Sequence, residues 1–261
     1  MLWAATALTI ATRRGWLDRP RPVRWRTVPM GDQSIMLAGL LVSGLAVSVV
    51  ASLAGAKPGE SPTSVVSLLG MITASAVTLC TWLALRRAPD ASIGTAPLTM
   101  PGAAVAGLTG LVVAWPCVAL VANLGDLAQV ALGGSPAPDV AHITLESLRA
   151  HAREPSAWGV ALAVVTLTPL TEEVVWRGAV QQSLKRVGLP RLVAVGVTAA
   201  LFALVHWSAV PEASRLSALP ALAMLGFALG WLMERTGRLI APVVAHGAFN
   251  AANLLLFSML G

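Results

Sequence analysis

The stretch AWGVALAVVTLTPLTEEVVWRGAV, residues 157–180, is apolar for most of its length, yet it contains Glu172, Glu173 and Arg177. A run of about 20 apolar residues is long enough to cross the hydrocarbon core of a bilayer as a helix. Each charged side chain within such a span costs a few kcal/mol on insertion scales, so its default interpretation is functional. This stretch therefore predicts a membrane helix that carries a polar site.

The composition of the whole chain is typical of a membrane protein. Of 261 residues, 56% are hydrophobic and 11% are charged, and the mean hydropathy is +0.74. These values exclude an ordinary soluble domain. Because every backbone amide must find a partner within its own segment, and strict strand alternation is missing, helices are the expected spanning form. We predict an all-α polytopic transmembrane bundle with about seven to eight membrane helices, with spans at 35–56, 65–85, 103–123, 157–187, 191–207, 216–234 and 239–260.

The charge pattern predicts partners and topology. The net charge is +6, and six arginines lie between residues 13 and 26, beside the predicted spans. Such a juxtamembrane cluster favours anionic lipid headgroups, and not nucleic acid, as its partner. The positive-inside rule places this segment in the cytoplasm, and residues 123–155 are expected to form the main extracytoplasmic loop. The high Ala, Val and Arg content without Tyr suggests a GC-rich bacterial genome, and hence a bacterial plasma membrane.

The charged residues of the opening stretch divide into a pair and a single carboxylate. On a helix, Glu173 and Arg177 are four residues apart and can form an ion pair. Glu172 lies about 100° around the helix from Glu173, so it can face a different neighbour. The pair is more typical of a structural ion pair than of a catalytic one, but Glu172 has no partner in its own segment.

Two further spans carry polar groups. LFALVHW ends at Trp207 and places His206 at the end of one span, with Phe202 one turn earlier. VVAHGAFNAAN, residues 243–253, places His246, Asn250 and Asn253 on one face of another span. His206 could be an interfacial histidine and Asn253 could bridge helices. A spare carboxylate and two histidines from three spans are harder to explain by packing, and a polar stripe should face other helices or water.

These residues resemble a known pattern. EEVVWR (172–177) matches EExxxR, FALVH (202–206) matches FxxxH, and HGAFN (246–250) matches HxxxN, in that order. The chain resembles the CPBP family of type II CAAX prenyl endopeptidases and bacteriocin-processing, Abi-like enzymes, which are glutamate intramembrane proteases. The resemblance covers residues 157–260. It implies an all-helical membrane fold with an intramembrane catalytic cavity, and peptide hydrolysis without a covalent intermediate.

The resemblance also implies a role for each motif residue. Glu172 corresponds to the catalytic glutamate and His206 to the histidine that helps it activate water. His246 and Asn250 correspond to the pair that stabilises the oxyanion, and Glu173 and Arg177 correspond to supporting residues. No cofactor or metal is implied. We accordingly divide the chain into N-terminal membrane helices with the extracytoplasmic loop (1–156) and a catalytic core (157–261), within one integrated membrane domain.

The function predicted is an intramembrane endopeptidase that hydrolyses a membrane-associated peptide or protein, prenylated or not. Two alternatives stay open. One glutamate and two histidines are also the ligand set of catalytic zinc, so a metallopeptidase could use Glu172, His206 and His246. A non-enzymatic immunity or scaffold protein, or a proton-coupled carrier, could use the same polar cluster to bind a partner or relay protons.

Overall fold

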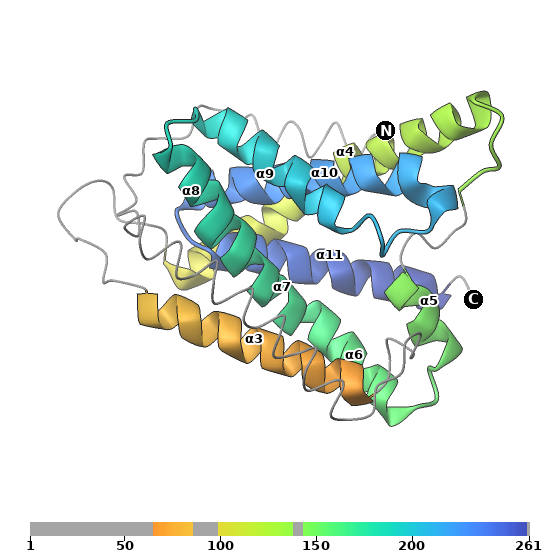
Figure 1. Cartoon of the computed structure of the whole chain (residues 1–261), viewed down its shortest axis with the longest axis horizontal. Helices are drawn as coiled ribbons and strands as arrows, with labels where there is room; N and C mark the ends of the chain where they lie inside the picture. Colours follow the sequence, from red (N-terminus) through yellow and green to blue (C-terminus); the bar gives the residue numbers. More distant parts are fainter. Residues whose placement is uncertain (1–64, 86–98, 138–142, 260–261) are drawn as a thin grey trace. The chain divides into compact units, whose positions relative to one another are not determined.

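A computed structural model describes residues 65–85, 99–137 and 143–259, and every regular element in these ranges is a helix. The all-α class is therefore confirmed for the described residues. The predicted span at 35–56 and the basic segment at 13–26 lie outside them. The helices, drawn in Figure 1, are α3 (Val65–Leu85), α4 (Met100–Ala131), α5 (Ile143–Ala150), α6 (Pro155–Val165), α7 (Leu167–Glu173), η1 (Val174–Val180), α8 (Gln181–Arg186), α9 (Arg191–Val205), η2 (Glu212–Ser214), α10 (Arg215–Thr236) and α11 (Ile240–Met259).

Within the described residues, three helical segments are long and apolar enough to cross a membrane: Met100–Ala131, Pro155–Arg186 and Glu212–Thr236. Shorter apolar helices run through Ser67–Cys80, Arg191–Val205 and Ile240–Leu256. Each of these six segments lies at a span predicted from the sequence. The total of about seven to eight membrane helices stays a prediction.

The predicted boundary between a span and a loop at residue 123 is wrong. Helix α4 continues to Ala131, and α5 is a further helix within the region expected to be a loop. Two residues of this region, Gly125 and Asp126, have structural roles in the helix. A side chain at Gly125 would collide with the backbone of α10 at Leu216. The Asp126 carboxylate accepts a hydrogen bond from the backbone N–H of Ala137 at 2.6 Å, and so ties the following loop to the helix.

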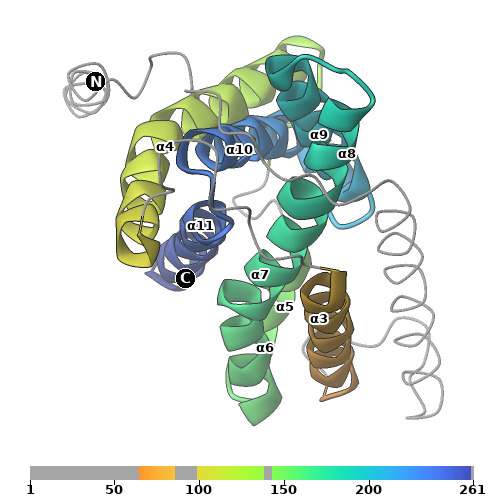
Figure 2. The ribbon, with the colours of Figure 1, turned by 90° about the vertical axis from the view of Figure 1, so that its left-hand side faces the viewer.

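The chain forms two compact units, each built from separate stretches of sequence. Among the described elements, unit 1 contains α4, α9, η2, α10 and α11 up to Ala245. Within it, α10 packs against both α4 and α9 (Figures 1 and 2). Close packing on α4 requires small residues, since a side chain at Gly107 would overlap the carbonyl of Ala241. Arg191 and Glu234 approach to 3.9 Å, so α9 begins where α10 ends.

Unit 2 contains α3, the chain from α5 to α8, and α11 from His246 onward. Figure 2 shows α3 alongside α6 and α7. Its apolar core is centred on three buried side chains from α5 and α6, with further contacts from α3 and α11. These core residues are Leu148, Ala157 and Val160, packed against Leu68, Met71, Ala161, Val164 and Leu254. This core holds in place the chain that carries the acidic motif. The predicted division of the chain at residue 156 stays a prediction.

Candidate functional site

The chain that carries the acidic motif is an interrupted helix. Thr166 has φ −118° and ψ −62°, which separates α6 from α7. Pro169 has no N–H to donate to the carbonyl of Val165, so the backbone ladder is weakened at the start of α7. After Glu173 the chain changes to the π-helix η1, a rare form that frequently occurs at functional sites. Helix α7 is therefore a segment of seven residues between two interruptions.

Glu173 and Arg177 form the ion pair that their spacing predicts. Nη1 of Arg177 donates to Oε1 of Glu173 at 2.9 Å, and both side chains are 0% exposed. Removing one partner of a buried pair leaves an uncompensated charge, which is far more costly than losing a surface pair. Arg177 therefore compensates the negative charge of the buried Glu173 carboxylate.

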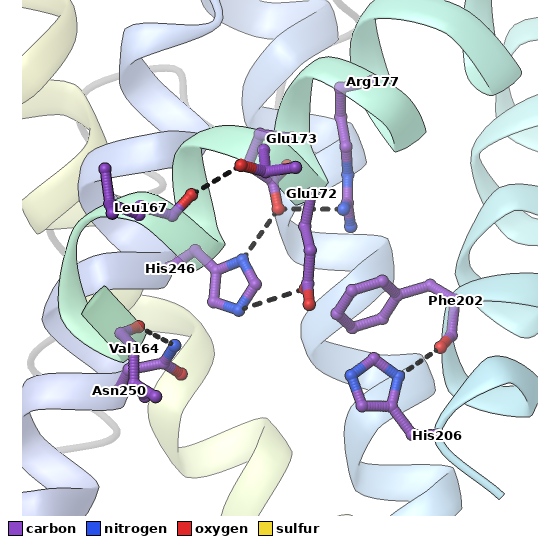
Figure 3. Close-up of polar contacts among 10 residues, drawn as sticks. Val164, Leu167, Glu172, Glu173, Arg177, Phe202, His206, His246 and Asn250 are labelled. Carbon is purple, nitrogen blue, oxygen red and sulfur yellow. Dashed lines mark hydrogen bonds and ion pairs between the residues drawn. The ribbon is translucent and has the colours of Figure 1, made fainter. Parts of the chain in front are cut away.

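His246 lies between the two adjacent carboxylates (Figure 3). Its Nδ1 is 2.8 Å from Oε1 of Glu173, and its Nε2 is 3.9 Å from Oε2 of Glu172. Since an ionised carboxylate only accepts hydrogen bonds, Nδ1 is the donor in the shorter contact. The ring is thereby oriented with Nε2 toward Glu172. The Glu172 side chain is 25% exposed, whereas His246 and Glu173 are buried.

The α6–α7 interruption is also where α11 docks. The Asn250 amide Nδ2 donates to the carbonyl of Val164 at 2.8 Å, at the end of α6 where backbone carbonyls lack helical partners. Next to His246, Gly247 faces the carbonyl of Val165, and a Cβ there would lie 2.6 Å from that oxygen. Only glycine allows this approach. Gly247 and Asn250 therefore bring α11 close enough for His246 to reach Glu173.

His206 belongs to unit 1 and closes α9 as its C-cap residue. Its Nδ1 lies 2.7 Å from the carbonyl oxygen of Phe202, and the two rings are 4.8 Å apart between centroids (Figure 3). A carbonyl only accepts, so Nδ1 donates and Nε2 is the nitrogen that bears the lone pair of the neutral ring. The FxxxH spacing thus has a structural meaning, because Phe202 orients His206 through its backbone and packs against its ring.

Unit 2 thus assembles four of the six residues to which the resemblance gives a role: Glu172, Glu173, Arg177 and His246. The fifth, Asn250, lies on the same face of α11 as His246 but bonds to the backbone of α6. Sequence reasoning missed Gly247, whose role depends on contact between helices. It also missed Thr171, whose hydroxyl lies 2.8 Å from Ser75 Oγ on α3. A Gly or Thr in a membrane helix is common, so no signal in the sequence marked either.

No group of three or more His, Cys, Asp and Glu side chains within residues 65–85, 99–137 and 143–259 is arranged to hold a metal ion. The zinc alternative is separated from water activation by the chelation experiment described in the Discussion.

Comparison with known families identifies one segment of the chain. Residues 154–252 match the family model described as "Type II CAAX prenyl endopeptidase Rce1-like". The matched segment contains all three motifs and extends from the start of α6 into α11. A search among curated proteins and a search among solved structures each returned no match.

Proposed function

Because residues 154–252 belong to the Rce1-like type II CAAX prenyl endopeptidase family, we propose that this membrane peptidase hydrolyses its substrate with a water molecule activated by Glu172. The family assignment confirms the resemblance drawn from the three motifs. It makes the chain, at the level of the family, a CAAX-type protease of the membrane. The roles of single residues and the identity of the substrate go beyond the family level, and we propose them below.

One observation supports the proposal above the others, namely the different environments of the two adjacent carboxylates. A single oxygen of Glu173, Oε1, accepts hydrogen bonds from both Arg177 and His246. Among the described residues the buried Oε2 of each carboxylate has no hydrogen-bond partner, but the Glu172 side chain is 25% exposed whereas that of Glu173 is 0% exposed. A general base must be able to reach the proton that it takes, directly or through one water. Glu172 meets this requirement and Glu173 does not.

The proposed reaction uses water directly. Glu172 accepts a proton from water as the oxygen attacks the scissile carbonyl carbon, and the same proton is later delivered to the leaving amine. From the family resemblance alone, we propose that His206 assists in the activation of water. His246 and Asn250 would donate to the oxyanion that forms on the carbonyl oxygen. In the imidazolium form both ring nitrogens of His246 are donors, so Nε2 can donate a hydrogen bond to the oxyanion while Nδ1 donates to Glu173.

The proposed substrate is a membrane-associated peptide or protein, and the family makes a prenylated C-terminus the first class to test. Lysine and arginine side chains at the ends of membrane helices favour anionic headgroups nearby, and we keep lipid contact as part of the proposal. Within unit 1, Arg191 at the start of α9 lies 3.9 Å from Glu234 near the end of α10, and Arg235 is the next residue of α10. We also propose a bacterial plasma membrane as the location.

The test is the substitution Glu172→Gln, which keeps the shape of the side chain and removes the base. Purified wild-type and variant chains would be incubated with a farnesylated peptide that ends in a CAAX sequence, and with the same peptide unprenylated. Cells carrying either chain would be compared by peptidomics for a precursor that accumulates uncut. We expect the variant to lose at least a hundredfold in rate, since general base catalysis contributes about 10²–10⁴-fold. Glu212→Gln, at an exposed glutamate of η2, is the matched control. Equal cleavage by wild type and Glu172→Gln would refute the mechanism.

A further inference from the structure

Helix α7 lies between two changes in the winding of the chain. It is separated from α6 at Thr166 and is followed by the π-helical turn that starts at Val174. Both interruptions change how the chain winds, so lateral contacts contribute to setting the rotation of α7 about its own axis. Glu172 lies on this segment, and the direction of its carboxylate depends on that rotation.

Two lateral contacts hold α7, and they lie on either side of Glu172 in the sequence. The residue after it, Glu173, contacts His246 of α11 at 2.8 Å. The residue before it, Thr171, has its hydroxyl 2.8 Å from both the carbonyl of Leu167 and the hydroxyl of Ser75 on α3. A hydroxyl donates one hydrogen bond and accepts others, so Thr171 can bond both partners at once.

Successive residues of a helix point about 100° apart. Contacts at Thr171 and Glu173 therefore hold the helix in two directions roughly 200° apart, and the side chain of Glu172 must point between them. We expect that loss of either contact rotates α7 and shifts the carboxylate of Glu172 relative to Nε2 of His246. The orientation of Glu172 thus depends on two different helices.

We propose that α3 is part of the catalytic apparatus, and that Ser75 is a positioning residue that orients Glu172 through Thr171. This inference rests on the proposed function of Glu172. Helix α3, residues 65–85, lies outside the segment that matches the family, residues 154–252. The N-terminal part of the chain therefore contributes to the site as well as to the membrane anchor.

The buried face of α3 carries small and hydroxylated residues, which suit a close polar contact with α7. It is lined by Gly70, Ser75 and Thr78, all small or hydroxylated, although the rest of the helix is mostly apolar. Small residues let membrane helices approach closely, and hydroxyls can then bond across the interface. Helix α3 packs against α6, α7 and η1, and a Cβ on Gly159 of α6 would lie 2.7 Å from the Leu68 side chain. The approach of α3 to this segment is therefore close along its length.

The first measurement is kinetic and uses the purified full-length chain in detergent with the farnesylated CAAX peptide. We expect Ser75→Ala and Thr171→Val each to lower kcat about tenfold with KM changed by less than about twofold, because misplaced catalytic groups affect the chemical step. The double variant should be no slower than the slower single variant. Ser75→Thr and Thr171→Ser keep a hydroxyl and should restore most of the rate.

Thr73→Val is the matched control for this experiment. Thr73 is on the same helix, and among the described residues its hydroxyl bonds to the carbonyl of Leu69, at 2.8 Å, on its own helix. It should leave kcat and KM unchanged. An unaltered kcat in both Ser75→Ala and Thr171→Val would overturn the proposal, and so would losses that multiply in the double variant.

The second measurement does not need a substrate. Nitrogen-15 NMR of the histidine rings reports the surroundings of His246, and the signal is assigned by its absence in His246→Gln. Rotation of α7 should shift this signal in Ser75→Ala and Thr171→Val but not in Thr73→Val. An unshifted signal in Ser75→Ala would overturn the role of α3 even if the protein cleaved peptide. Cleavage that does not depend on Glu172 would instead refute the proposed function, and the ring signal would still decide the role of α3.

Discussion

Oε1 of Glu173 accepts hydrogen bonds from Nδ1 of His246 at 2.8 Å and from Nη1 of Arg177 at 2.9 Å. One oxygen thus joins the acidic motif to the histidine of another motif 73 residues later in the chain. The contact selects which ring nitrogen of His246 faces Glu172, a choice that decides whether that nitrogen donates or accepts. Glu173 therefore acts on the site through His246.

Glu173→Gln should change the tautomer of His246. The amide can donate to Nδ1 as well as accept from it, so the requirement for a proton at Nδ1 disappears. Nitrogen-15 NMR of the four histidines would show wild-type His246 with Nδ1 protonated and the variant with a mixture. Glu154→Gln, at the exposed start of α6, serves as control. An identical ring signal in Glu173→Gln would contradict the assigned role.

Arg177→Met should destabilise the protein strongly, because it leaves the Glu173 carboxylate buried without its cation. Loss of one partner of a buried pair costs about 3–5 kcal/mol. The double variant Glu173→Gln/Arg177→Met removes both charges and should recover part of that loss. Reversible unfolding in mixed micelles measures both. If the double variant were as unstable as Arg177→Met alone, the uncompensated charge would not be the cause.

Gly247→Ala should separate α11 from the α6–α7 interruption, since the new Cβ would lie 2.6 Å from the carbonyl oxygen of Val165. We expect a loss of about 1–3 kcal/mol in the free energy of unfolding, together with loss of cleavage. Gly196→Ala on α9 is the matched control, because a Cβ at Gly196 meets no atom within 4 Å. A stable and active Gly247→Ala protein would show that α11 does not need this close approach.

Asn250→Ala should reduce cleavage far more than Asn253→Ala. Asn250 bonds to Val164 on another helix, whereas Asn253 bonds to Phe249 one turn before it on its own helix, each at 2.8 Å. Loss of a donor to the oxyanion typically costs about 10²–10³-fold in kcat. Kinetics with the farnesylated peptide would measure the difference. Equal effects of the two substitutions would remove Asn250 from the mechanism.

Chelation separates water activation by Glu172 from the zinc alternative. Treatment of the purified protein with a strong zinc chelator, followed by dialysis, should leave the cleavage rate unchanged. Metal analysis of the untreated protein should find far less zinc than the one equivalent that a zinc site would hold. Activity that disappears on chelation and returns with added zinc would favour the metallopeptidase.

Much of the fold was predictable because a membrane imposes simple rules on sequence. The predicted span at 65–85 has the bounds of α3, and the spans at 191–207 and 239–260 differ from α9 and α11 by two residues or fewer at each end. These boundaries follow from apolar length alone. The end of α4 was not predictable in this way, because it depends on tertiary contacts. Gly125 leaves room for the backbone of α10, and Asp126 accepts a hydrogen bond from the following loop.

The sequence by itself determined the membrane helices, the family motifs and the ion pair of Glu173 with Arg177, because each depends on apolar length or on spacing within one helix. The tertiary structure alone decided that His246 bonds to Glu173, that Asn250 bonds to Val164 and that Ser75 lies against Thr171. These partners are 73, 86 and 96 residues apart. The periodicity of a helix determines which residues share a face, but only the packing of helices determines which residues of another helix that face contacts.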